Sequence, residues 1–138
     1  MITWNNLDKL TSYQELEKTE SVDLAAVMAG ENGAERVKNY SVPMAEGLAY
    51  NYAAKKVDDT VLAALEKLAE EAQLAEKFEA VYNGEIVNTG EKRLVLHHMT
   101  RGQLGDAVEA DGVDKRTFYV EQQKKIAEFA NKVHAGEI

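Results

Sequence analysis

The strongest constraint on the fold of this chain is a helical pattern of apolar residues in its middle third. Between Asp58 and Gly84 such residues recur every three or four positions, which places them on one side of an α-helix. They are Val61, Leu62, Leu65, Leu68, Ala69 and Ala72, followed by Leu74, Phe78, Val81 and Tyr82. Asp58 or Asp59 is the expected N-cap, and Asn83 with Gly84 is the expected stop. The pattern predicts a helix over about 59–73 and a second segment over about 74–82. The side chains expected to be buried together are Leu62, Leu65, Leu68 and Ala69.

Composition points to the same fold class. The chain has 138 residues, 45% of them apolar, and a single proline. This length suffices for one domain with its own core. We find no internal repeat and no low-complexity tract, so residues 1–138 are interpreted as a single segment. The expected fold is mainly α, with one or two short strands.

Further helices are predicted near both ends. The pairs Thr11 with Gln14 and Ser12 with Glu15 have capping-box spacing, which predicts a short helix ending near residue 19. Asp23 is the expected N-cap of a helix over 24–29 with Gly30 as its stop, and further turns are expected over 33–38. A long helix is expected from Asp114 or Lys115 to His134. Its expected buried face consists of Tyr119, Ile126, Phe129, Ala130 and Val133, interrupted by Gln122 and Gln123.

The remaining parts of the chain are expected to form short strands, one further helix and a loop. Pro43 forces residues 41–42 into an extended conformation, and the alternation of Leu48, Tyr50 and Tyr52 predicts a half-buried strand over 47–53. A second short strand is expected over 85–87. Asn88 lies three residues before Glu91, which predicts a helix over about 91–99. The acidic, glycine-rich stretch 101–114 is interpreted as a loop.

Charge and cysteine content exclude several classes of function. The formal net charge of −8 disfavours nucleic acid and anionic membrane surfaces as partners. With no cysteine, the chain has no thiol catalysis, disulfide scaffold or thiolate zinc site. The N-terminus lacks a basic and apolar targeting pattern, and the longest apolar run covers only residues 24–29. We therefore expect a soluble, cytoplasmic protein.

No group of residues in the sequence has the pattern of a catalytic, cofactor-binding or metal site. His97 and His98 are adjacent, so their side chains point about 100° apart on a helix, and we expect one ring packed and one solvated. Asp111 with Gly112 matches part of a calcium loop, but Ala107 and Phe118 would occupy two of its ligand positions. The basic doublets are interpreted as solvated helix faces. They are Lys55-Lys56, Lys92-Arg93, Lys115-Arg116 and Lys124-Lys125.

One stretch carries a family resemblance. Residues 84–97 read Gly-Glu-Ile-Val-Asn-Thr-Gly-Glu-Lys-Arg-Leu-Val-Leu-His and follow two predicted helices. This stretch resembles the N-terminal region of the glucose-6-phosphate isomerase family. The resemblance extends to an early strand at 48–52 and to a helix end at 129–137. Departures include Asn51-Tyr52-Ala53 for the usual Asp-Tyr-Ser, Leu94 for a small residue, and Met99-Thr100 for the usual Ala-Leu before Arg101.

The resemblance implies only part of an enzyme. It covers roughly the first quarter of the family, before the glycine-rich sugar-binding loop, the phosphate-binding Ser/Thr loop, the glutamate base and the ring-opening histidine. We therefore assign no catalytic residue, no cofactor and no metal ligand. The whole family member would be α/β, would interconvert glucose 6-phosphate and fructose 6-phosphate in glycolysis and gluconeogenesis, and would be a homodimer.

In such an enzyme this segment would be a scaffold against the catalytic sugar-isomerase domains, inactive by itself. We expect it to expose apolar surface and to form an oligomer, with Gln122 and Gln123 near an interface on the 119–133 helix. The alternative interpretation is a free-standing helical interaction module without enzymatic activity.

Overall fold

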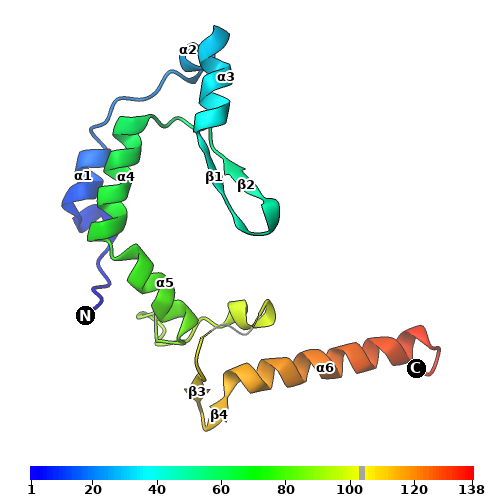
Figure 1. Cartoon of the computed structure of the whole chain (residues 1–138). Helices are drawn as coiled ribbons and strands as arrows, with labels where there is room; N and C mark the ends of the chain where they lie inside the picture. The colour runs from blue at the N-terminus through cyan, green and yellow to red at the C-terminus, as the bar shows by residue number, and fades with distance from the viewer. Residues whose placement is uncertain (103–104) are drawn as a thin grey trace. The chain divides into compact units, whose positions relative to one another are not determined.

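The computed structural model describes residues 1–102 and 105–138 and is mainly helical, with two small antiparallel sheets in this part of the chain (Figure 1). The chain divides into two compact units. The N-terminal unit consists of Asn5–Ala72, and the C-terminal unit consists of Gln73–Ile138 together with Met1–Trp4. The predicted fold class, mainly α with short strands, is confirmed.

The N-terminal unit is built from short helices around one longer helix. Its helical elements are η1 (Leu7–Lys9), α1 (Thr11–Leu16), α2 (Leu24–Val27), α3 (Gly30–Asn39), η2 (Ala45–Gly47) and α4 (Asp59–Glu71). Two predicted N-caps are confirmed. The Asp23 carboxylate accepts a hydrogen bond from the Ala26 N–H at 3.1 Å, and the Asp58 carboxylate accepts one from the Val61 N–H at 2.8 Å.

The N-terminus of α1 is capped differently from the prediction. Leu10 occupies the N-cap position, and neither predicted capping box forms. Instead, Glu71 of α4 accepts hydrogen bonds from the backbone N–H groups of Thr11 at 3.1 Å and Ser12 at 2.7 Å, and also from the Ser12 hydroxyl. The carboxylate of a neighbouring helix thus satisfies the free donors of α1. This interaction holds α1 against α4.

A β-hairpin completes the N-terminal unit. Strands β1 (Ser41–Pro43) and β2 (Ala49–Asn51) pair in antiparallel fashion, with Val42 opposite Tyr50. The predicted strand is confirmed, but its side chains are more exposed than its alternating pattern indicates. Leu48 is 65% exposed and Tyr50 is 49% exposed. A two-stranded sheet has only one neighbour per strand, so it covers little of its own apolar surface.

The C-terminal unit contains α5 (Leu74–Tyr82), η3 (His97–Thr100), β3 (Glu109–Ala110), β4 (Val113–Asp114) and α6 (Lys115–His134). The predicted strand at 85–87 and the predicted helix at 91–99 are wrong. Asn88 does accept a hydrogen bond from the Glu91 N–H at 3.1 Å, as a helix cap would. The chain then turns at Lys92, whose φ is 53°, and Asn88 bridges to Arg93 instead of starting a helix.

The stretch 101–114 also differs from the loop that was predicted. It contains the β3–β4 hairpin, closed by Asp111 and Gly112 with φ values of 55° and 73°. Two consecutive residues with positive φ are typical of the tight hairpin turn that an Asp-Gly pair favours. Residues 103–104 of the predicted loop lie outside the described residues.

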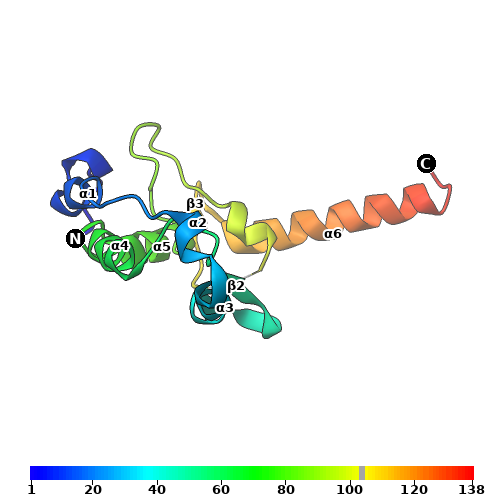
Figure 2. The ribbon, with the colours of Figure 1, turned by 90° about the horizontal axis from the view of Figure 1, so that it is seen from above.

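Helix α6 has the predicted bounds and the predicted cap. Asp114 accepts hydrogen bonds from the Arg116 N–H at 3.1 Å and the Thr117 N–H at 3.3 Å. The prediction of its buried face is wrong, because Ile126 is 67% exposed and Phe129 is 59% exposed. Figures 1 and 2 show no other element of the C-terminal unit beside the C-terminal part of α6.

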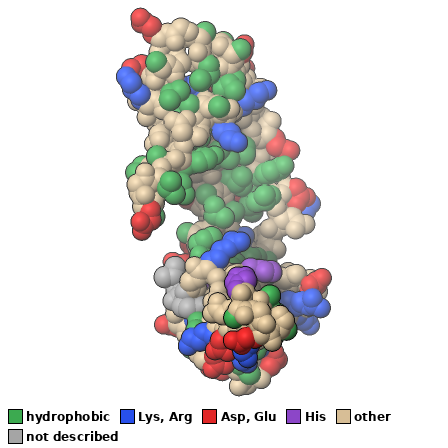
Figure 3. Space-filling view, turned by 90° about the vertical axis from the view of Figure 1, so that its right-hand side faces the viewer, with side chains coloured by type: hydrophobic (Ala, Val, Ile, Leu, Met, Phe, Trp, Pro, Cys, Tyr) green, Lys and Arg blue, Asp and Glu red, His purple; other side chains and the backbone are tan. Residues whose placement is uncertain are grey.

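The core is small for a chain of this length. Its buried apolar residues are Leu10, Val22, Ala53, Ala72, Ala80, Met99 and Val108. No residue of α4 is fully buried, and Leu65 is 38% exposed, so the prediction that this helix buries Leu65 is wrong. Figure 3 shows hydrophobic side chains gathered on the surface of the upper half of the view, over the hairpin and α4. In the described ranges no helix is long and apolar enough to cross a membrane.

Candidate functional site

Arg36 of α3 makes three hydrogen bonds to the backbone of a loop in the N-terminal unit and holds that loop in place. Its Nε donates to the Ala53 carbonyl at 2.8 Å, and its Nη2 donates to the carbonyls of Lys55 at 3.0 Å and Val57 at 2.6 Å. The guanidinium also lies 4.0 Å from the centre of the Tyr40 ring. Arg36 thus fixes residues 53–57, which connect the hairpin to α4.

Arg116 plays a similar part in the C-terminal unit. Its Nη2 donates to the Tyr82 carbonyl at 2.6 Å, and its Nε donates to the Asp106 carbonyl. The residue is only 7% exposed, so the prediction that the Lys115-Arg116 doublet is solvated is wrong for Arg116. The arginine fork suits this role because it can reach several carbonyl oxygens at once. Arg116 fastens α6 to the end of α5.

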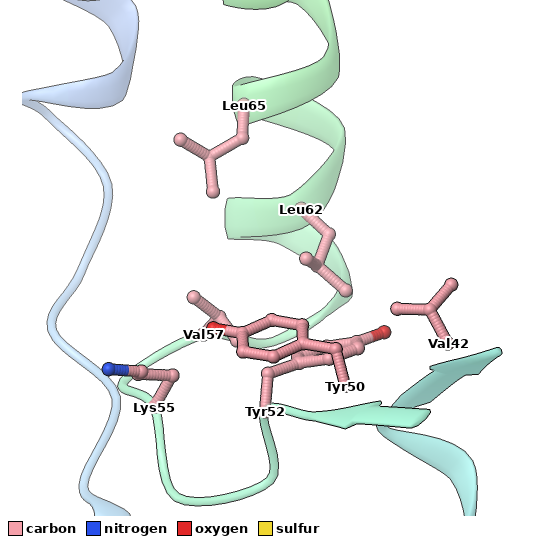
Figure 4. Close-up of a pocket in the computed structure, with 7 residues that line it drawn as sticks. All are labelled: Val42, Tyr50, Tyr52, Lys55, Val57, Leu62 and Leu65. Atoms are coloured by element: carbon pink, nitrogen blue, oxygen red, sulfur yellow. The ribbon is translucent and has the colours of Figure 1, made fainter. Parts of the chain in front are cut away.

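An apolar groove lies beside the hairpin in the N-terminal unit (Figure 4). It has a volume of about 350 Å³ and is lined by Val42, Tyr50, Tyr52, Lys55, Val57, Leu62 and Leu65. The rings of Tyr50 and Tyr52 stack with their centres 6.0 Å apart. Lys55 contributes the one charged side chain of this lining. Such a groove can accept apolar side chains, but its lining has no acid–base pair.

A second hollow, of about 870 Å³, lies in the C-terminal unit. It is lined by Gly84, Glu85, Ile86, Lys92, Arg93, Leu94, Leu96, Glu109, Ala110, Asp111 and Lys115. Residues of the family-like stretch 84–97 therefore form much of its wall. Its lining holds three cationic and three carboxylate side chains, and Lys115 pairs with Asp111 at 3.4 Å.

The histidines have the environments that their adjacency predicts. His97 is exposed, whereas His98 is half-buried with its ring centre 4.6 Å from that of Tyr82. The prediction of one packed and one solvated ring is confirmed. Within residues 1–102 and 105–138, no three His, Asp or Glu side chains are grouped in a way that could hold a metal ion.

The groups whose pKa values are shifted take part in structural hydrogen bonds. The Ser12 hydroxyl, with the N–H groups of Ser12 and Thr11, lowers the pKa of Glu71. The Thr117 hydroxyl, with backbone N–H groups at the start of α6, lowers the pKa of Asp114. Burial raises the pKa of Tyr40, and its 3.0 Å hydrogen bond to Asp59 acts in the same direction. The two carboxylates serve helix N-termini and line neither hollow.

Comparison with known proteins decides the family. The model of the family described as phosphoglucose isomerase matches residues 51–138. The chain belongs to the phosphoglucose isomerase family. The match includes the stretch 84–97 on which the sequence resemblance depends, so that resemblance is confirmed.

Relatives of this family match nearly the whole chain. A glucose-6-phosphate isomerase of Treponema denticola is 51% identical over 98% of this chain and 27% of its own length. One from Treponema pallidum (strain Nichols) is 39% identical over 98% of this chain and 26% of its own length. A crystal structure of a glucose-6-phosphate isomerase from Chlamydia trachomatis is 30% identical. It aligns with a TM-score of 0.70 over 91% of this chain and 25% of that one.

The chain therefore spans about a quarter of the length of these isomerases and corresponds to their N-terminal part. Sequence reasoning placed the family-like stretch correctly but missed Arg36 and Arg116. A single arginine in a helix carries no local signal of burial, since its partners are carbonyl oxygens of distant loops. The exposed Arg93 also lies in a basic doublet, so the sequence does not distinguish an exposed arginine from a buried one such as Arg116.

Proposed function

We propose that this chain is the N-terminal scaffold of a glucose-6-phosphate isomerase and does not catalyse the reaction alone. The observation that carries the proposal is the 51% identity over nearly the whole chain to a quarter of such an enzyme. The exposed hairpin groove and the exposed face of α6 support it, because a segment shaped to pack against a larger body retains apolar surface.

The chemistry of the reaction explains why the chain alone should be inactive. Isomerisation of a hexose phosphate opens the sugar ring and then moves a proton between C1 and C2. This requires a positioned base, an acid–base group at the ring oxygen and donors for the phosphate and the developing oxyanion. The groove lining offers two tyrosines and Lys55, and the second hollow offers equal numbers of cations and carboxylates in its lining, of which Lys115 and Asp111 form an ion pair. Neither set supplies that combination of groups.

The remaining expectations follow from the same proposal. The partners of this segment would be the catalytic sugar-isomerase domains of the enzyme and the second subunit of a homodimer. The reaction would belong to glycolysis and gluconeogenesis in the cytoplasm, which agrees with the absence of cysteine. We expect no cofactor, and we expect neither nucleic acid nor a membrane as a partner, given the net charge of −8.

Two assays test the proposal. In the first, the purified chain is incubated with fructose 6-phosphate, and glucose 6-phosphate is detected by a coupled enzyme. No turnover above the buffer rate is expected. Turnover that follows the chain's concentration, in protein from an isomerase-deficient host, would show that the chain itself holds the chemistry.

In the second assay, a chimera is made in which this chain replaces the matching N-terminal part of the Treponema denticola isomerase. The expected result is an active, folded enzyme. A folded but inactive chimera, or one that does not fold although the parent does, would contradict the scaffold role. That result would favour the alternative of a free-standing interaction module.

A further inference from the structure

Three exposed apolar residues in the C-terminal part of α6 form a stripe along one side of the helix. Ile126, Phe129 and Val133 are 67%, 59% and 44% exposed and are spaced by three and four residues, so they lie on one side of the helix. Gln122 and Tyr119 continue the same spacing towards the N-terminus of α6. Lys124, Glu128 and Asn131 lie on the other side. The helix is thus amphipathic over its C-terminal part, where its own unit offers no cover.

The N-terminal part of α6, in contrast, is firmly attached. Arg116 bonds the carbonyls of Tyr82 and Asp106, and the Gln123 side-chain amide donates to the Thr100 carbonyl at 2.8 Å. Beyond Gln123, no hydrogen bond or ion pair to another described element is found. Figure 2 shows this part of the helix standing clear of η3 and the β3–β4 hairpin. The attached end therefore fixes the direction in which the stripe is presented.

We propose that the stripe of Ile126, Phe129 and Val133 is the docking surface for the catalytic domains of the isomerase. The inference rests on the proposed function and specifies which surface it uses. In the relatives about three quarters of the polypeptide lies outside the matched N-terminal part, and α6 is the element nearest to it in sequence. Catalytic domains joined directly after α6 are held at high local concentration beside this stripe. We therefore expect an apolar surface of these domains to cover the stripe.

The test uses one substitution on the stripe and one matched control on the opposite side. Phe129→Glu places a carboxylate in the proposed interface, whereas Asn131→Glu adds the same charge on the polar side. Both positions are exposed here, and glutamate is a good helix former, so neither change should unfold the chain by itself. Each variant is made in the isolated chain and in the Treponema denticola chimera.

In the isolated chain, both variants should keep the thermal midpoint and helical circular dichroism of the unsubstituted protein. In the chimera, Phe129→Glu should lower isomerase activity or the yield of folded enzyme about tenfold or more, because an unpartnered carboxylate in an apolar interface is costly. Asn131→Glu should leave both unchanged. The differential loss identifies the stripe as an interface, since the isolated chain shows that the helix itself is intact.

Two results would overturn the inference while leaving the scaffold proposal standing. One is an active chimera that tolerates Phe129→Glu as well as Asn131→Glu. The other is an isolated chain that dimerises through this stripe, so that Phe129→Glu makes it monomeric in light scattering while the chimera stays fully active. An unsubstituted chimera without activity would instead contradict the scaffold proposal itself.

Discussion

Replacing Arg36 by leucine should lower the free energy of unfolding of the N-terminal unit far more than a substitution at an exposed arginine does. Arg36 is 8% exposed, and its guanidinium donates three hydrogen bonds to the backbone of residues 53–57. Leucine fills part of the space but donates nothing. The carbonyl of Ala53, a residue that is 2% exposed, then has little access to water as a replacement donor.

The size of the effect follows from these contacts. A hydrogen bond to a charged group contributes about 1.5–3 kcal/mol, and an exposed carbonyl recovers part of this loss from water. Lys55 is exposed, so its carbonyl recovers most, whereas that of Ala53 recovers little. The contact with the Tyr40 ring adds about 0.5–1 kcal/mol. Together these terms give a destabilisation of about 3–5 kcal/mol for Arg36→Leu.

Urea unfolding followed by circular dichroism at 222 nm measures this value. The control is Arg93→Leu, since the Arg93 side chain is 77% exposed and, among residues 1–102 and 105–138, its only ion pair is a 3.7 Å contact with Glu91 on the surface. That variant should change the free energy of unfolding by about 0.5 kcal/mol or less. A loss below about 1 kcal/mol for Arg36→Leu would refute the assignment of Arg36 as the residue that holds the 53–57 loop.

Three further substitutions test the packing. Because hydrogen bonds lower the pKa of Glu71, its stabilising effect is present at neutral pH. That effect is lost as pH falls through the folded-state pKa, so Glu71→Gln should reduce stability at pH 7 and flatten the acid side of the stability profile measured in urea. Gly84→Ala should cost about 1–3 kcal/mol in the same assay, because the residue has a φ of 69° and an added Cβ would collide with Val108. In a double-mutant cycle, the cost of Gly84→Ala should be smaller in a Val108→Ala background than in the unsubstituted chain; an equal cost in both backgrounds would show that the collision is not the cause. Leu65→Ala should cost only about 1–2 kcal/mol, less than for a buried leucine, because Leu65 is 38% exposed; a cost above about 3 kcal/mol would show that it is packed in solution.

Local signals in the sequence predicted the local structure well. The N-caps Asp23, Asp58 and Asp114 each accept the expected backbone hydrogen bond, and their helices begin within a residue of the predicted positions. The extended segment before Pro43 and the strand at Tyr50 are also present. These features depend on interactions among residues close in sequence, which a pattern can represent.

Features set by distant residues were not predicted. Glu71 caps α1 from sixty residues away, which made the local capping boxes of Thr11 and Ser12 unnecessary. The helix expected after Asn88 failed for a local reason instead: Asn88 forms the cap-like hydrogen bond, but the positive φ of Lys92 turns the chain.

The exposed face of α6 was predicted wrongly for a different reason. An apolar stripe shows that a helix has a surface to bury, but not whether the same chain contains the partner. For this reason the burial of Ile126 and Phe129 was predicted wrongly although the helix itself was predicted correctly.

The most direct test of the scaffold role is steady-state kinetics of the Treponema denticola chimera beside its parent enzyme. If residues of this chain position the catalytic domains but do not touch the sugar, KM for fructose 6-phosphate should stay within about twofold of the parent value, with kcat largely retained. A KM raised about tenfold or more in a stable, folded chimera would show that this N-terminal segment forms part of the substrate site, and would contradict the account.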